Sequence, residues 1–212
     1  MDDATYAEAN WTDIDEAVVF SEEECLVYIP DPNFKSALLA TQSINYNRDD
    51  EIQFSEAYNT ERIFVRELGI ADMTGLEAFI NITELGCSSN ELTSLNVSSN
   101  TALTDLDCYS NQLTSLDVSS NTALTVLYCS SNELTSLDVN ANTLLRELGC
   151  GNNQLTSLDI SSNTGLNEVD CRANQLTSLY VSTNTLLTIL SCDCNHLPSR
   201  DVSANIVLER LQ

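Results

Sequence analysis

The amino-acid sequence predicts a right-handed, β-rich solenoid with short strands, turns on the convex side and a small helical amino-terminal cap. A unit of 21 residues recurs along most of the chain, and each unit carries leucine, cysteine and asparagine at fixed spacing. The leucine or its substitute is Leu85, Leu106, Leu127, Leu148, Val169 or Leu190, the cysteine is Cys87, Cys108, Cys129, Cys150, Cys171 or Cys192, and the asparagine is Asn90, Asn111, Asn132, Asn153, Asn174 or Asn195. This period and spacing are typical of a leucine-rich repeat solenoid, whose coils bury their apolar sides against one another.

Each unit also divides into two similar halves. The second half, LTSLDVSxN, has inward positions such as Leu116 and Val118, and it ends at its own asparagine, such as Asn121. Asparagine suits both corners because its side chain bonds neighbouring backbone groups and tolerates unusual turns. We therefore expect two stacked ladders per coil, with neighbouring coils about 4.7–4.9 Å apart.

These repeats resemble the 21-residue, two-half class of bacterial leucine-rich repeats found in internalins, including their cysteine ladder. The resemblance covers residues 82–208 and is specific for the fold. Internalin relatives are secreted or wall-attached proteins that bind host or surface partners. The resemblance therefore implies a non-enzymatic extracellular or cell-surface module for binding or adhesion, which recognises a protein or glycan partner.

The chain divides into three parts. Residues 1–24 form an acidic arm, residues 25–61 a helical cap, and residues 62–212 the solenoid, whose first coil is degenerate. Within the cap, Asp31 and Pro32 predict the start of a helix that continues to about Ala40. At the other end, Pro198 and Arg200 break the repeat in a way typical of a sheet edge that cannot pair with another strand, whereas Leu208 and Leu211 would also suit a further coil.

The large excess of acidic residues limits the classes of molecule that this protein can bind. The chain has 32 acidic and 8 basic residues, a formal net charge of -24. Nucleic acid and anionic membrane surfaces are excluded because both need clustered Lys and Arg. Basic partners or divalent cations fit this charge, and solubility outside the cell is the other explanation.

The opening residues lack the basic and apolar regions of a secretion signal. Either a signal was removed or the protein is cytoplasmic, and the resemblance favours a secreted or cell-surface protein. No apolar run approaches the ~18 residues of a membrane span, so we expect no membrane insertion. We also expect a monomer.

Six cysteines occupy one inward position in successive coils. There cysteine acts as a small hydrophobe, and side chains that point the same way in register aim their sulfurs poorly for a disulfide. We expect a reduced structural ladder.

The segment Asn45–Glu56 resembles the calcium loops of EF-hand and dockerin-like modules. The candidate ligands are Asn45, Asn47, Asp49, the backbone of Glu51, Gln53 through water, and Glu56. Asn45 replaces the usual Asp, and Asp50 replaces the glycine of the sharp turn. Two interpretations stay open: a site for Ca²⁺ or another hard cation, or a loop held by its own hydrogen bonds. No other cofactor is expected.

Two further chemistries are disfavoured. Cys192, Cys194 and His196 suggest zinc, but Cys192 belongs to the ladder and zinc usually takes four ligands. His196 is the only histidine, and the many Ser and Thr hydroxyls lack an evident activating base, so no enzymatic activity is expected.

The concave face of the first half-coil is the candidate partner surface, because its outward residues vary while the second half hardly changes. The predicted contacts are Tyr109 and Tyr128 as anchors, with Asp107, Glu147, Glu168, Asp170 and Arg172 around them. Aromatic anchors carry much interface energy, and the acids would steer a basic partner. The alternative is a structural solenoid whose threonine rows match a polysaccharide or ice lattice; neutral drift also explains the variation.

Overall fold

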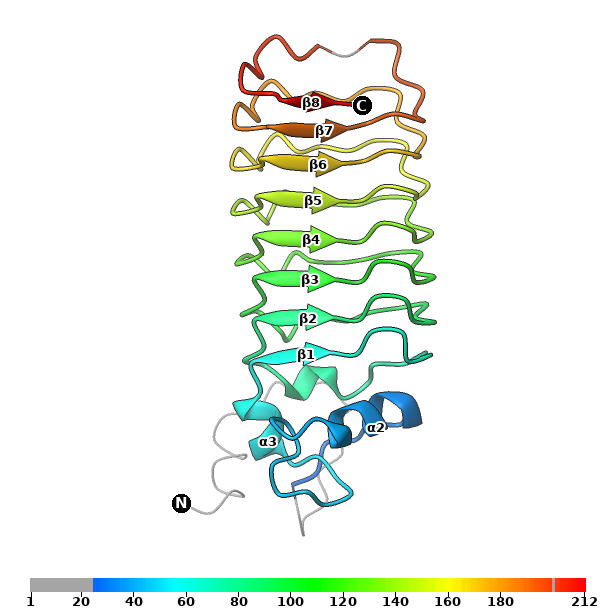
Figure 1. Ribbon diagram of the computed structural model, residues 1–212, viewed down its shortest axis with the longest axis vertical. Helices are drawn as coiled ribbons and strands as arrows, with labels where there is room; N and C mark the ends of the chain where they lie inside the picture. Colours follow the sequence, from blue (N-terminus) through cyan, green and yellow to red (C-terminus); the bar gives the residue numbers. More distant parts are fainter. Residues whose placement is uncertain (1–24, 200) are drawn as a thin grey trace.

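The computed structural model describes residues 25–199 and 201–212, which form a stack of coils with a helical cap at one end (Figure 1). The predicted acidic arm, residues 1–24, and the predicted edge residue Arg200 lie outside the described residues. Within the described part, no helix has the length and apolar character needed to span a membrane.

In the part of the chain that the structure describes, eight short strands follow two helices, and one 3₁₀ turn lies between the first two strands. The elements are α2 (Pro32–Ala40), α3 (Phe54–Asn59), β1 (Arg62–Phe64), η1 (Leu76–Ala78), β2 (Glu84–Gly86), β3 (Asp105–Asp107), β4 (Val126–Tyr128), β5 (Glu147–Gly149), β6 (Glu168–Asp170), β7 (Ile189–Ser191) and β8 (Arg210–Leu211). The strands pair in chain order into one parallel sheet. The predicted leucine-rich repeat solenoid with a small helical amino-terminal region is confirmed.

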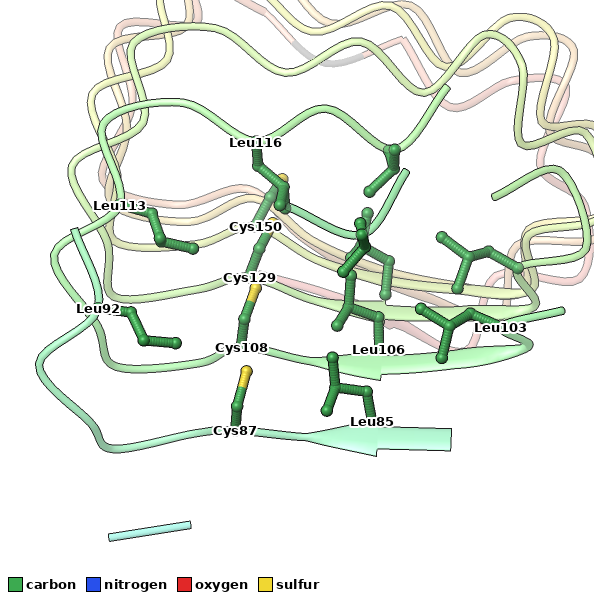
Figure 2. Packing of buried hydrophobic residues seen from close by; sticks show 14 of the residues in the cluster. Leu85, Cys87, Leu92, Leu103, Leu106, Cys108, Leu113, Leu116, Cys129 and Cys150 are labelled. Atoms are coloured by element: carbon green, nitrogen blue, oxygen red, sulfur yellow. The ribbon is translucent and has the colours of Figure 1, made fainter. Parts of the chain in front are cut away.

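The middle residue of each strand from β2 to β7 points into the core, and the flanking residues point outward. The register places Leu85 beside Leu106, and Leu106 beside Leu127. Because side chains alternate along a strand, the cysteine two residues after the leucine also points inward. Figure 2 shows Cys87, Cys108, Cys129 and Cys150 in one column between leucines of the two half-coils.

The cysteine column is fully buried, and no disulfide joins the cysteines of the described chain from Cys87 to Cys171. Burial raises the pKa of the Cys129 thiol to about 12, and the pKa values of the Cys87 and Cys171 thiols are raised similarly. These thiols are therefore neutral at physiological pH, as expected for side chains that act as small hydrophobes.

Buried asparagines tie each coil to the one before it. Asn132 Nδ2 donates to the carbonyl oxygens of Cys108 (3.0 Å) and Cys129 (3.1 Å), and its Oδ1 accepts from Leu113 N (3.0 Å). The second row works in the same direction, because Asn142 Nδ2 donates to carbonyls of the preceding coil. Both corners are thus held by side chains, as the sequence predicted.

The prediction of two strand ladders per coil is wrong. Only the first half-coil forms strands among the described residues, and the second half is irregular. The N–H of Ser119 bonds to the Asp117 carboxylate of its own coil (2.9 Å). Such local side-chain bonds draw backbone groups away from a ladder.

The cap begins as predicted. Asp31 precedes α2, and its Oδ1 accepts from Asn33 N and Phe34 N, both at 2.9 Å. Its Oδ2 accepts from Ala71 N (2.9 Å) in the first coil. One carboxylate therefore both starts a helix and attaches the cap to the solenoid.

Candidate functional site

The outward residues of the parallel sheet form three columns, which we call the sheet face. The first and second columns come from the two ends of each strand, and the third lies two residues after the strand. The first column is Glu84, Asp105, Val126, Glu147, Glu168 and Ile189; the second is Gly86, Asp107, Tyr128, Gly149, Asp170 and Ser191; the third is Ser88, Tyr109, Ser130, Gly151, Arg172 and Asp193. Parallel register places successive members of each column side by side, so residues 21 apart in sequence share one surface.

A hollow of about 520 Å³ lies on this face over β4, β5 and β6, and we call it the tyrosine hollow. Its lining is Asp107, Tyr109, Tyr128, Ser130, Ser131, Leu148, Gly149, Gly151, Asn152, Glu168, Asp170, Arg172 and Ala173. Tyr109 and Tyr128 are 46% and 38% exposed, so both rings are accessible on the surface.

Two glycines create the depth of the hollow. A Cβ on Gly149 would lie 2.9 Å from Tyr128 Cδ1, and one on Gly151 would lie 3.0 Å from Asp170 Oδ1. Any larger residue in this coil would therefore press against the flanking side chains. The coil of β5 carries only hydrogen where its neighbours carry Tyr128, Asp170 and Arg172.

The Tyr128 ring is held by its hydroxyl, which donates to the Glu147 carboxylate on the next strand. Partial burial and the bond to Glu147 raise the pKa of Tyr128. The phenol therefore stays protonated and keeps its bond to the acid across the physiological range. Tyr128 is an oriented ring rather than a freely moving one.

Two of the acids around the hollow are neutralised by arginines. Arg172 donates to Asp170 Oδ2 from Nε (3.0 Å) and Nη2 (2.7 Å). Asp107 pairs with Arg66 of the first coil at 3.1 Å. These pairs are partly exposed and contribute little stability, but they remove two negative charges from the surface.

Glu147 and Glu168 lie side by side without a basic partner among the described residues. They are register partners on β5 and β6. Like charges directly opposite on adjacent strands repel. This pair therefore gives the rim of the hollow a negative potential that a cationic group would relieve.

The structure brings six of the seven predicted partner residues into one hollow, and Glu147 lies beside it through Tyr128. The binding role of these residues stays a prediction. Sequence reasoning missed the floor, Gly149 and Gly151; a pair of glycines where other coils carry large side chains was the available signal. It also missed Phe64 and Arg66 of the first coil, where the guanidinium lies 5.8 Å from the Phe64 ring centre.

Comparisons with known proteins agree with this architecture. No protein-family profile matches the chain. Over 74 residues it is 42% identical to Internalin J of Listeria monocytogenes serotype 4b (strain F2365), a match that covers 35% of this chain and 8% of that protein. The solved functional domain of InlJ from Listeria monocytogenes, which includes a cysteine ladder, superposes with a TM-score of 0.69 and 36% identity. This chain is an internalin-like leucine-rich repeat solenoid with a cysteine ladder.

This chain spans less than half the length of the Internalin J protein and of the solved InlJ domain. The InlJ superposition takes in 86% of this chain and 45% of the InlJ domain. Internalin C2 from Listeria monocytogenes str. 4b F2365 superposes over 92% of this chain and 99% of its own length, with a TM-score of 0.68. At 19% identity, that likeness shows the fold alone.

The predicted calcium loop of the internalin-like chain is held by its own side chains. Asn45 is buried and donates to the carbonyl of Asp49 (2.9 Å), while Asn47 Nδ2 donates to Asp49 Oδ2 (2.8 Å). Glu56 is buried, and its Oε2 accepts from Gln53 N (3.1 Å). These bonds agree with the second interpretation, a loop held by its own hydrogen bonds.

Two further features of that loop differ from an EF-hand. Glu51 forms an ion pair with Lys35 at 2.6 Å. The left-handed residue is Arg48 (φ 62), whereas the EF-hand pattern places its turn glycine at the position of Asp50. Calcium binding at Asn45–Glu56 stays a prediction.

The two cysteines of the disfavoured zinc site differ in solvent exposure. Cys192 is buried in the ladder, and Cys194 is exposed. Across residues 25–199 and 201–212, no group of three or more His, Cys, Asp or Glu side chains could hold a metal ion.

Proposed function

We propose that this chain is a non-enzymatic binding module, secreted or displayed on a bacterial cell surface, that recognises a protein partner at the tyrosine hollow. The observation that carries the proposal is the hollow itself: two exposed tyrosines beside a glycine floor, with Glu147 and Glu168 unpaired by any cation in the described chain. The likeness to internalins supports a binding role, and a repeat class by itself names no partner.

The chemistry of the hollow favours a basic side chain of the partner, lysine or arginine. Aromatic faces attract a cation within about 6 Å of the ring centre, with about 0.5–2 kcal/mol per contact. The Glu147 and Glu168 carboxylates add attraction, and the strongly acidic chain as a whole speeds the approach of a basic protein. Arg172 and Arg66 are already paired, so they leave the hollow open to a second cation.

Phage-displayed random peptides test this proposal, because their selection requires no candidate partner. Peptides selected on the wild-type chain should carry Lys or Arg at a fixed position. The double variant Tyr109→Ala and Tyr128→Ala should bind them with a loss of at least 2 kcal/mol, which is about 30-fold in Kd. Circular dichroism should show that the variant remains folded, because both rings lie on the surface.

Asp117→Asn is the matched control, because Asp117 lies on the second half-coil away from the sheet. It should leave Kd unchanged. Equal losses in the control and the tyrosine variant would place the interface elsewhere, and selection of peptides without basic residues would contradict the cation chemistry. The threonine rows are exposed, so the lattice alternative keeps its own test, which is thermal hysteresis above an albumin control.

A further inference from the structure

A second hollow lies on the sheet face next to the tyrosine hollow, and we call it the phenylalanine hollow. It measures about 140 Å³, and its apolar lining is Phe64, Leu85, Leu106, Val126 and Tyr128. Tyr128 and Asp107 line both hollows. The two hollows therefore form one continuous surface along the stack.

Both hollows are built by an aromatic residue that faces a glycine on the next strand. Phe64 is paired in register with Gly86, as Tyr128 is paired with Gly149. A Cβ on Gly86 would lie 2.9 Å from Phe64 Cδ1 and 2.9 Å from Arg66 Nε. The Arg66 guanidinium lies 5.8 Å from the Phe64 ring centre. Phe64 therefore already has a cation near its ring, but it is still 55% exposed.

The acids of the phenylalanine hollow have partners within the chain. Glu84 pairs with Arg62 at 3.3 Å, and Asp107 pairs with Arg66 at 3.1 Å. Asp105 accepts from the hydroxyl of the preceding threonine at 2.6 Å. The carboxylate pair beside the tyrosine hollow, in contrast, has no basic partner among the described residues. The two hollows therefore differ in the group that they attract, an apolar one here and a cation there.

The size of the phenylalanine hollow fits one side chain. Its volume corresponds to four or five water molecules at about 30 Å³ each. This is close to the four carbon atoms of a leucine side chain. Exposed apolar side chains that gather around a hollow are typical of a binding surface. We therefore expect a leucine-sized apolar side chain of a partner to occupy it.

The floors of the two hollows are two to three coils apart. Leu85 and Leu106 lie at the bottom of the phenylalanine hollow, and Leu148 lies at the bottom of the tyrosine hollow. The strands follow one another along the stack (Figure 1), so the floors are separated by about 10–14 Å. Residues seven positions apart on a helix span about 10.5 Å and point to one side. Residues four positions apart on an extended strand span about 13 Å.

The backbone hydrogen bonds of the sheet favour the helix over the extended strand. Strands β2 to β7 each have a paired neighbour on both sides, and the bonds continue just after the strands, as between Cys108 N and the Tyr128 carbonyl (2.8 Å). An extended partner lying across these strands would lose water from its own N–H and C=O groups without gaining partners. A helix bonds these groups internally.

We propose that the partner segment is an amphipathic helix that lies along the stack. It places an apolar side chain in the phenylalanine hollow and a Lys or Arg, seven positions away, in the tyrosine hollow. This inference rests on the proposed function, because the basic side chain is the one that the tyrosine hollow holds. Two anchors at a fixed spacing let the protein select one helix among many basic segments.

A library displayed on a small helical-bundle scaffold tests this inference. The exposed face of one helix is randomised, and phage display selects binders on the wild-type chain. Selected helices should carry an apolar residue with Lys or Arg seven positions away. Phe64→Ala should raise Kd about tenfold, as for an aromatic anchor. Val126→Ser, which keeps the size of this wall of the hollow, should raise Kd about threefold by the loss of apolar contact.

A double-mutant cycle shows whether the two side chains meet. Replacing the apolar residue of the selected helix by Ala should raise Kd about tenfold, and combining it with Phe64→Ala should add little further loss. Circular dichroism should show that Phe64→Ala remains folded, because the ring is on the surface. Tyr180→Ala is the matched control, since Tyr180 is an exposed aromatic residue on the second half-coil, and it should leave Kd unchanged.

Fully additive losses in the cycle would overturn the inference, as would selected helices that lack the seven-residue spacing. Linear peptides that bind through Tyr109 and Tyr128, with no helical binder selected, would also overturn it but leave the proposed function in place. Absence of a preference for Lys or Arg in both libraries would contradict both.

Discussion

At the scale of single residues, the cysteine ladder is a packing device whose chemistry is suppressed by burial. The pKa values of the Cys108 and Cys150 thiols are raised well above their usual range by burial and by the neighbouring thiols of the column. A thiolate in this column would be a buried charge beside others of its kind. The neutral, narrow side chain lets strands approach where leucine would be too wide.

The raised pKa values of the buried thiols predict that the protein becomes less stable at alkaline pH. The folded-state pKa of Cys129 is about 12, against about 8.5 in an unfolded chain. Because the folded pKa is the higher one, the stabilisation is complete below pH 8.5 and is lost as pH rises toward 12. Urea titrations should show a free energy of unfolding that falls by about 1.4 kcal/mol per pH unit for each thiol in that window.

Cys129→Ala should show a shallower decline than the wild-type chain, because one titrating thiol is gone. An identical decline would mean that other groups cause it.

Thiol titration in denaturant without reductant should find at least six free thiols, and two or fewer would refute the reduced ladder.

At the scale of elements, the leucine and cysteine spacing was sufficient to predict the strands β2 to β7 and their register. It could not separate the two half-coils, because both carry leucine at the same spacing. The outcome depended on Asp117 and its equivalents, whose carboxylates bond backbone N–H groups locally. Whether a backbone N–H bonds to a nearby carboxylate or to a neighbouring strand depends on local geometry. The repeat period alone does not reveal that geometry.

The candidate site, like the fold, could be predicted from the sequence only in part. Alternation along the strands identified the outward columns, and variation between coils identified Tyr109 and Tyr128. The hollow itself depends on two glycines and on the Arg172–Asp170 pair, which joins two residues of one coil rather than residues of adjacent coils. Side-chain conformations of three successive coils set that arrangement, so a single sequence does not reveal it.

The attachment of the cap rests on Asp31. Burial alone would raise the pKa of this carboxyl, but backbone N–H groups of Phe34, Ala71, Asp72 and Asn33 bond to it and hold the pKa below its ordinary value. The charged form is therefore the form that joins helix α2 to the first coil. The stability it supplies is present above the unfolded pKa of about 3.9 and is lost as pH falls through the lower folded value.

Asp31→Ala should destabilise the protein by about 2 kcal/mol, since it removes a helix cap worth about 1 kcal/mol and leaves N–H groups of the first coil unbonded. Urea unfolding followed by circular dichroism measures this. Asp50→Ala, at an exposed carboxylate, is the control and should change stability by under about 0.5 kcal/mol. Equal effects of the two substitutions would show that Asp31 does not attach the cap.

At the scale of the whole molecule, the repeat separates two tasks. The buried leucines, cysteines and asparagines recur because each coil must fit the next, whereas the sheet face is free to differ from coil to coil. That freedom produces the tyrosine hollow over β4, β5 and β6, on a stack whose strands follow one another in chain order (Figure 1). A non-repeating surface is what an asymmetric partner needs.

The central claim is that partners bind at the tyrosine hollow on the sheet face. Hydroxyl-radical footprinting with mass spectrometry, with and without a selected peptide, tests it most directly, because Tyr180 on the second half-coil is 79% exposed and serves as an internal control. The account predicts that the peptide protects Tyr109 and Tyr128 from oxidation and leaves Tyr180 unchanged. Protection of Tyr180 with no change at Tyr109 and Tyr128 would contradict it.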